Sequence, residues 1–251
     1  MDGASLALAG GAAIAGGLVN AIAGGGSLIT FPALVALGIP PVAASVTNTV
    51  AMCPGYFGAT LAQRRQLEGQ GARAIRILPI AALGGIGGAL LLLGTGERAF
   101  TTVVPFLILL AALLLAMQER IKKWLVGRER IARDGWVLVP IALSAVYGGY
   151  FGAGLGVMVL AALAICFDEN LIKVNALKQS VSLVVNVAAA LVFMMSGETV
   201  WSVIPVMAGG ALLGGALGGL VASRVPPAVL RWMVVTTGIG VSIVYFVKLL
   251  R

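Results

Sequence analysis

Residues 171–195, LIKVNALKQSVSLVVNVAAALVFMM, form an apolar segment long enough to cross a bilayer, which takes about 20 residues as a helix. Lys178 lies inside this segment, where a cation costs at least roughly 2.5–3.5 kcal/mol. Polar residues recur around it at helical spacing and share one face: Asn175, Lys178, Gln179, Ser182 and Asn186. The stretch predicts a transmembrane helix whose polar face carries one positive charge. A ligand or partner of opposite charge is the usual reason for such a residue.

The whole chain has the composition of an integral membrane protein. Of its 251 residues, 60% are hydrophobic and 10% are charged, and the mean hydropathy is +1.05. A soluble domain averages about 25% charged residues. Hydrophobic units of helical length cover residues 4–37, 42–62, 75–94, 99–118, 136–166, 171–196, 200–222 and 227–250. Because the strands of a membrane barrel are shorter and alternating, the sequence predicts an all-α, polytopic helical bundle within the lipid bilayer.

The net charge of +8 comes mainly from loops and does not indicate a nucleic-acid partner. More than half of the 17 Lys and Arg residues lie in two connections, residues 63–76 and 118–135. Such loops stay in the cytoplasm, so we expect a multi-pass protein of the inner membrane. The N-terminus, MDGASLALAGG, lacks the basic region of a cleaved signal peptide, and we expect the first unit to be retained. We interpret Cys53 and Cys166 as reduced packing residues.

The chain repeats itself. The glycine cluster Gly24-Gly25-Gly26-Ser27 of the first unit has a counterpart in the fifth, Gly152-Ala153-Gly154-Leu155-Gly156. At one constant offset, Ser45, Asn48, Thr49, Met52 and Tyr56 align with Asn175, Lys178, Gln179, Ser182 and Asn186. We therefore divide the chain into a first transmembrane repeat, residues 1–118, a basic linker, residues 119–135, and a second repeat, residues 136–251.

Units 4–37 and 136–166 are too long for one plain span, and each is interrupted by its glycine cluster. If each unit enters the membrane and returns, each half makes three further crossings and the two halves are inverted, as in many secondary transporters. If each is a single tilted span, the halves run parallel. Both basic loops fall on one side in either case, so charge does not decide. We prefer inverted halves with broken or re-entrant first units.

The glycine clusters and the two polar faces are the candidate substrate site. Glycines expose backbone N–H groups, and a helix that restarts after them presents the positive end of its dipole to an anion. The alternatives are that the glycines only allow close packing and that Lys178 snorkels to the interface. The predicted binding residues are Gly24, Gly25, Gly26, Ser27, Asn48, Thr49, Gly152, Gly154, Asn175, Lys178, Gln179, Ser182 and Asn186, with Asn20 as a further candidate.

The residues that are absent exclude several kinds of protein. The chain has no histidine, and its nine carboxylates lie in loops or at the ends of the apolar units. No cluster could hold a catalytic metal, and no Ser–His or Cys–His pair can form. We therefore expect no enzyme, no metal and no cofactor. A cation transporter is disfavoured because the buried charge is positive.

Two stretches also resemble a known family. Residues 16–55, GGLVNAIAGGGSLITFPALVALGIPPVAASVTNTVAMCPG, and residues 148–186 are similar to the two signatures of the TauE/SafE-type sulfite/organosulfonate exporter family, in order over nearly the whole chain. The resemblance implies a secondary transporter of small sulfur-containing or carboxylate anions, with two repeated halves. It carries over site roles to Gly24, Gly25, Gly26, Asn48, Thr49, Gly152, Gly154, Lys178 and Asn186.

The resemblance does not transfer the substrate, the direction of transport or the coupling ion. Two other functions stay open, an anion channel and a non-transporting membrane assembly protein. A monomer and a homodimer are both compatible with the sequence.

Overall fold

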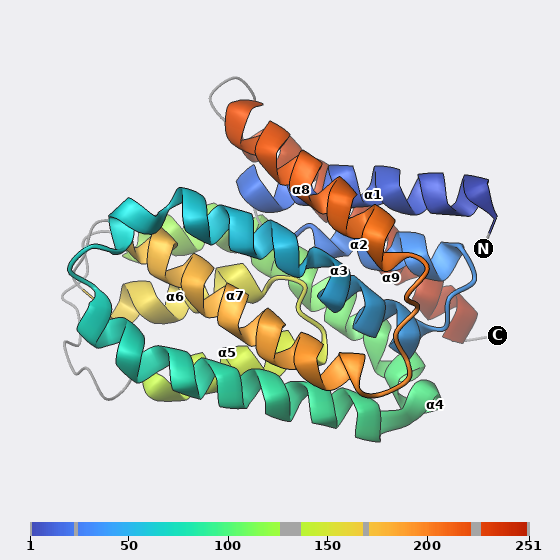
Figure 1. Cartoon of the computed structure of the whole chain (residues 1–251), viewed down its shortest axis with the longest axis horizontal. Helices are drawn as coiled ribbons and strands as arrows, with labels where there is room; N and C mark the ends of the chain where they lie inside the picture. The colour runs from blue at the N-terminus through green and yellow to red at the C-terminus, as the bar shows by residue number, and fades with distance from the viewer. Residues whose placement is uncertain (1, 23–24, 126–136, 168–170, 222–226, 250–251) are drawn as a thin grey trace.

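The computed structural model describes residues 2–22, 25–125, 137–167, 171–221 and 227–249, and these parts of the chain are helical apart from their connections (Figure 1). The helices are α1 (Gly3–Ile22), α2 (Ser27–Ala36), α3 (Pro41–Ala62), the short 3-10 helix η1 (Arg64–Leu67), α4 (Gly71–Leu125), α5 (Leu138–Tyr150), α6 (Leu155–Cys166), α7 (Leu171–Met194), α8 (Ile204–Val221) and α9 (Pro227–Leu249). Within the described residues, the helices long and apolar enough to cross a membrane are Gly3–Ala21, Gly71–Ile121 and Ile172–Met194. The predicted all-α membrane fold is confirmed.

The two longest hydrophobic units are each divided into two helices at their glycines. The first unit gives α1 and α2, and the fifth gives α5 and α6. Gly25, Gly152 and Gly154 have φ values of 89°, 78° and 79°, a region that residues with a Cβ rarely enter. The start of α2 lies beside the body of α1, since a Cβ atom on Gly26 would meet the Asn20 Cβ at 3.1 Å. Figure 1 shows α2 running back along α1.

The third and fourth units form one long helix, α4, with a break at Gly96. The backbone there has φ 75° and ψ 161°, which is not helical. Glu97, the next residue, accepts the backbone N–H of Val42 at 3.3 Å and so holds the break against the start of α3. The break thus separates two legs, residues 71–95 and 97–125.

Glycines bring helices of different halves into direct backbone contact. A Cβ on Gly17 would lie 2.5 Å from the Ala211 carbonyl oxygen, where α1 crosses α8. Gly10 of α1 faces Val206 and Gly218 of α8 faces Ala21, so these two helices run parallel. This is the close packing that small residues allow within membranes.

The second such pair joins the first leg of α4 to α5. Gly84 faces Ala145, and Gly88 faces Tyr150 one turn further on, so these helices also run parallel. A Cβ on Gly149 would overlap the backbone of Gly85. In both pairs, therefore, the third hydrophobic unit of one half of the chain packs against the first hydrophobic unit of the other half.

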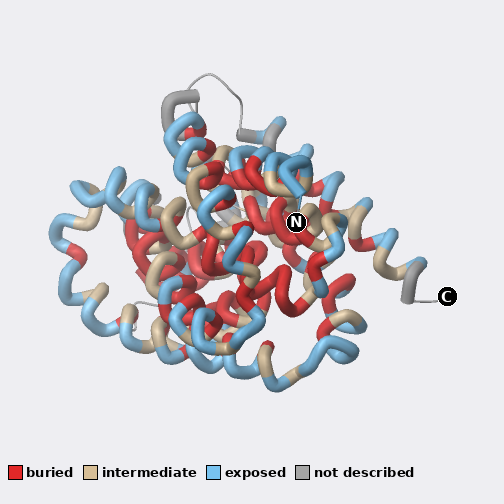
Figure 2. The backbone as a smooth tube through the Cα atoms, turned by 45° about the vertical axis from the view of Figure 1, so that its right-hand side comes forward, coloured by how far each residue is buried: buried red, intermediate tan, exposed pale blue. Residues whose placement is uncertain are grey.

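Figure 2 shows that the buried residues gather where these helices meet and that exposed residues lie around the outside. Phe31 of α2 lies against Phe100 of α4 and Phe151 after α5, with ring centroids 6.4 and 5.4 Å apart. Leu83, Leu143 and other large hydrophobic side chains are exposed on the surface. An apolar outer surface is what a bilayer requires.

α3 and α7 cross the centre of the molecule in opposite directions. At one end, Asn175 of α7 donates to the Gln63 side chain at the end of α3, at 2.8 Å. At the other end, Thr47 of α3 accepts the backbone N–H of Val200, which follows α7, at 3.0 Å. The middle turns of their two polar faces are thereby brought together. Cys53 and Cys166 are both free thiols.

Candidate functional site

A small cavity lies where α2 and α6 begin. Its lining comes from α1, α2, α3, α6, α7 and the glycine turns, and consists of Asn20, Gly25, Ser27, Tyr56, Gly152, Gly154, Gly156, Lys178, Gln179 and Ser182. The space open to the centre of a water-sized molecule is about 10 Å³. A cavity of that size holds about one water molecule. The cavity therefore brings one lysine and several polar groups from both halves around a very small volume.

The N-terminal ends of two helices face this cavity. Ser27 is the first residue of α2, and Gly154 and Gly156 flank the first residue of α6. Neither helix has a side-chain cap on its first N–H groups. The N–H groups of Leu28 and Leu155 donate to the carbonyl oxygens of Gly25 and Gly152, and the positive end of each helix dipole favours an anion at such a place.

Lys178 adds a full positive charge to the partial positive charges of the two helix ends. Its Nζ lies 3.9 Å from the position that a Cβ on Gly156 would occupy, so the side chain lies along the first turn of α6. A cation beside a helix N-terminus is the unfavourable arrangement, because both are positive. An anion placed between Lys178 and the two helix ends would convert this repulsion into attraction.

Ser182 contributes a buried hydroxyl. The residue is 1% exposed, and its Oγ has no hydrogen-bond partner among the described residues. Buried hydroxyl groups in proteins are nearly always hydrogen-bonded, and leaving one unpaired costs roughly 1–3 kcal/mol. A ligand in the cavity would supply the missing partner.

Amide and phenol side chains form a further part of the cavity and its surroundings. The side chains of Asn20 and Asn186 lie within hydrogen-bonding reach of the Tyr56 hydroxyl. Asn186 also donates to the Ser182 carbonyl oxygen at 2.8 Å. Asn186 thus positions Tyr56 and lies against the α7 backbone, while Asn20, Tyr56 and Gln179 reach the cavity itself.

The structure brings together many of the predicted site residues. Those that line the cavity are Gly25, Ser27, Gly152, Gly154, Lys178, Gln179 and Ser182, together with the further candidate Asn20. Tyr56 and Gly156 also line it, although the sequence did not mark them as site residues. Each carried a signal, since Tyr56 aligns with Asn186 in the repeat and Gly156 ends the second glycine cluster.

Other predicted residues lie outside the lining. Asn48, which aligns with Lys178 in the repeat, accepts the Thr30 hydroxyl at 2.5 Å and joins α3 to α2. Thr49 donates to Ser45 of its own helix at 3.0 Å. The remaining ones are Gly26, which packs against α1, Asn175, bonded to Gln63, and Asn186, described above. Gly24 lies outside the described residues.

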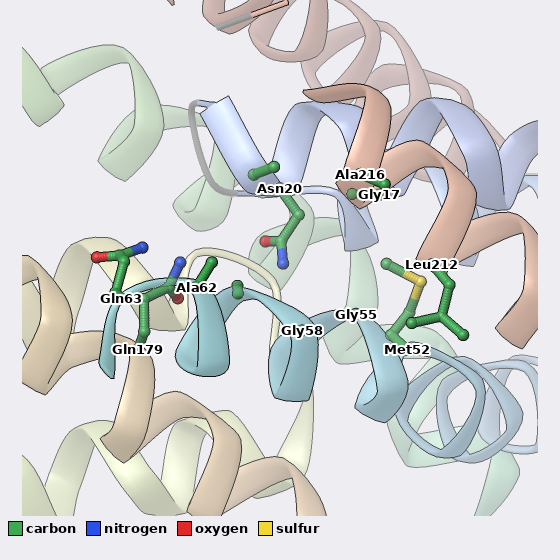
Figure 3. Close-up of a pocket in the computed structure, with 13 residues that line it drawn as sticks. Gly17, Asn20, Met52, Gly55, Gly58, Ala62, Gln63, Gln179, Leu212 and Ala216 are labelled. Carbon is green, nitrogen blue, oxygen red and sulfur yellow. The ribbon is translucent and has the colours of Figure 1, made fainter. Parts of the chain in front are cut away.

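A larger apolar crevice adjoins the cavity (Figure 3). It has a volume of about 460 Å³ and runs between α1, α3 and α8. Asn20 and Gln179 line both the crevice and the cavity. Figure 3 shows Asn20 pointing from α1 toward α3, with Gln63 and Gln179 at one end and Met52 and Leu212 at the other. The end at Gln63 lies next to the basic residues of η1.

Known proteins resemble the chain over nearly its full length. The family description "Sulfite exporter TauE/SafE" matches residues 8–245. A probable membrane transporter protein of Haemophilus influenzae is 30% identical over 226 residues, which are 86% of this chain and 85% of that protein. The probable membrane transporter protein YfcA of Escherichia coli K12 is 29% identical over 244 residues, 95% and 87% of the two chains. The probable membrane transporter protein ORF9 of a Sinorhizobium species is 27% identical over 232 residues, 92% and 88%. No solved structure matches significantly.

Proposed function

The chain belongs to the sulfite exporter TauE/SafE family, and on that premise we propose that it is a secondary transporter of small anions in the inner membrane. The anions are sulfite, organosulfonates or related sulfur-containing or carboxylate anions. One observation carries the proposal, namely that two uncapped helix N-termini, Lys178 and the unpaired Ser182 hydroxyl meet at one cavity. All four features favour negative charge, and they come from both halves of the chain.

The proposed residues have distinct roles. Lys178 supplies the full charge, and the positive dipole ends of α2 and α6 add partial positive charge beside it. Ser182 and Gln179 complete the shell with neutral groups. Because the cavity holds about one water molecule, an anion with four heavy atoms requires the ends of α2 and α6 to move apart. The described conformation is then a closed one, and substrate binding is coupled to a change of conformation.

We also propose that the two halves are inverted repeats. The first unit of each half packs in parallel with the third unit of the opposite half, at Gly17 in α1 and at Gly149 in α5. The sequence-aligned helices α3 and α7 run in opposite directions (Figure 1). The proposed substrate site would then lie at the interface of the halves, which is common in transporters with inverted repeats.

Labelling of two equivalent loop positions tests the inversion. Glu68 follows α3 and Glu198 follows α7, and both are exposed. Inverted halves place the two residues on opposite sides of the membrane, whereas parallel halves place them on one side. In a Cys53→Ala, Cys166→Ala background, we expect an impermeant maleimide to label Glu198→Cys from outside and Glu68→Cys only after permeabilisation. Labelling of both from the same side would contradict the inversion.

Transport by proteoliposomes tests the function. We expect saturable uptake of labelled methanesulfonate that accelerates when the vesicles are preloaded with unlabelled methanesulfonate, because a carrier exchanges its substrate across the membrane. An anion channel would instead give large, non-saturating currents without such exchange. An assembly protein would give no flux at all. Either of these two results would reject the transporter proposal.

A further inference from the structure

We propose that the apolar crevice between α1, α3 and α8 receives the organic group of the transported anion, while the charged head group lies in the cavity. The assignment rests on the proposed function and names its preferred substrates, which are anions with an apolar substituent larger than methyl. Inorganic anions and methanesulfonate would use the cavity alone.

The first argument is continuity between the two spaces. Asn20 and Gln179 line both, so no helix separates the crevice from the cavity. Both residues carry amide side chains that can donate to an anionic head group while their carbon atoms face the crevice. A molecule whose head is held by Lys178 therefore has its substituent directed past these two amides.

The second argument is the chemistry of the crevice. Beyond Asn20, Gln63 and Gln179, its lining is formed by the apolar side chains of Met52 and Leu212 and by glycines and alanines. Such a surface offers few partners to a hydrated inorganic ion but favours an apolar group that leaves water. The volume of about 460 Å³ exceeds the roughly 150 Å³ that accommodates benzene in an engineered cavity.

Two glycines make the crevice wide. A Cβ on Gly58 or on Gly215 would meet no atom within 4 Å, although both residues line the crevice. A larger side chain at either position would fill the crevice without disturbing the helix contacts. Gly87 of α4 is equally free of neighbours and does not line the crevice, so Gly87→Leu is a matched control.

The test compares anions that share a head group. The melting temperature of the purified protein is measured against methanesulfonate, butanesulfonate and benzenesulfonate at constant ionic strength. For the wild type we expect the affinity to rise about 10-fold or more from methanesulfonate to benzenesulfonate. In Gly58→Leu and Gly215→Leu the benzenesulfonate affinity should fall about 10-fold, while methanesulfonate affinity should be preserved. Gly87→Leu should behave as the wild type.

The outcomes separate this inference from the function on which it rests. Equal affinities along the series, or filled variants that bind benzenesulfonate as well as the wild type, would overturn the inference and leave the anion site intact. The latter result is expected if lipid chains occupy the crevice. If methanesulfonate and the larger sulfonates all fail to stabilise the wild type, the proposed function and the inference both fail.

Discussion

Lys178→Ala is expected to abolish uptake of labelled methanesulfonate by proteoliposomes while the protein still folds. Lys178 supplies the only full positive charge among the residues lining the cavity. Removing one partner of a buried, hydrogen-bonded charge pair costs roughly 2–5 kcal/mol, which corresponds to a loss of about 30-fold to several thousand-fold in affinity. The substrate therefore loses most of its binding free energy, and the measured initial rate of uptake should fall to background.

Folding should survive this substitution for an electrostatic reason. The Lys178 ammonium lies beside the N-terminal turn of α6, where a positive charge is unfavourable when no anion is bound. Lys178→Met, which retains an unbranched apolar side chain, should give the same loss of uptake with an unchanged or higher melting temperature. Lys123→Met, at an exposed position near the end of α4, is the charge-matched control and should transport normally. Normal flux in Lys178→Ala would reject the site.

Gly88→Ala is expected to cause a large loss of stability. The added methyl group would overlap the Val146 carbonyl oxygen and lie 2.8 Å from the Tyr150 nitrogen. Because these are backbone atoms of α5, the two helices would have to move apart. Overpacking of this kind typically costs about 1–3 kcal/mol, and more when no side chain can yield.

The adjacent residue provides the control for this prediction. A Cβ on Gly87 would meet nothing within 4 Å, so Gly87→Ala should melt as the wild type does or slightly higher. Gly214→Ala and Gly215→Ala form a second pair of this kind in α8, since only Gly214 lies against the Ile14 backbone. Yield and melting temperature in detergent give the comparison. Equal stability within each pair would show that the helices do not approach as described.

The helices could be predicted from the sequence because a bilayer imposes their length and hydrophobicity. The boundaries of α3, α7, α8 and α9 follow the apolar units closely. The breaks in the first and fifth units could also be predicted, since their glycines adopt conformations that other residues avoid. The separation of the third and fourth units could be predicted too, since the non-helical residue Gly96 lies between the apolar stretches 75–94 and 99–118.

Only part of the predicted polar face lies at the cavity, because periodicity identifies a helix face but not the depth of a site along it. From Asn175 to Asn186 that face extends about 16 Å at 1.5 Å per residue, which is longer than a small anion. Lys178, Gln179 and Ser182 lie at the cavity, whereas Asn175 is used to join α7 to Gln63. The crossing of α3 and α7 decides which turns meet, and it places Tyr56, not Asn48, in the lining.

The central claim is that the cavity between the starts of α2 and α6 binds an anion through Lys178. The most direct test is the melting temperature of purified wild type and Lys178→Met as methanesulfonate is titrated at constant ionic strength. A ligand that binds the folded state at 100 times its Kd stabilises it by about 2.7 kcal/mol. We predict a saturable rise for the wild type and none for Lys178→Met. The same saturable rise in both proteins would contradict the claim.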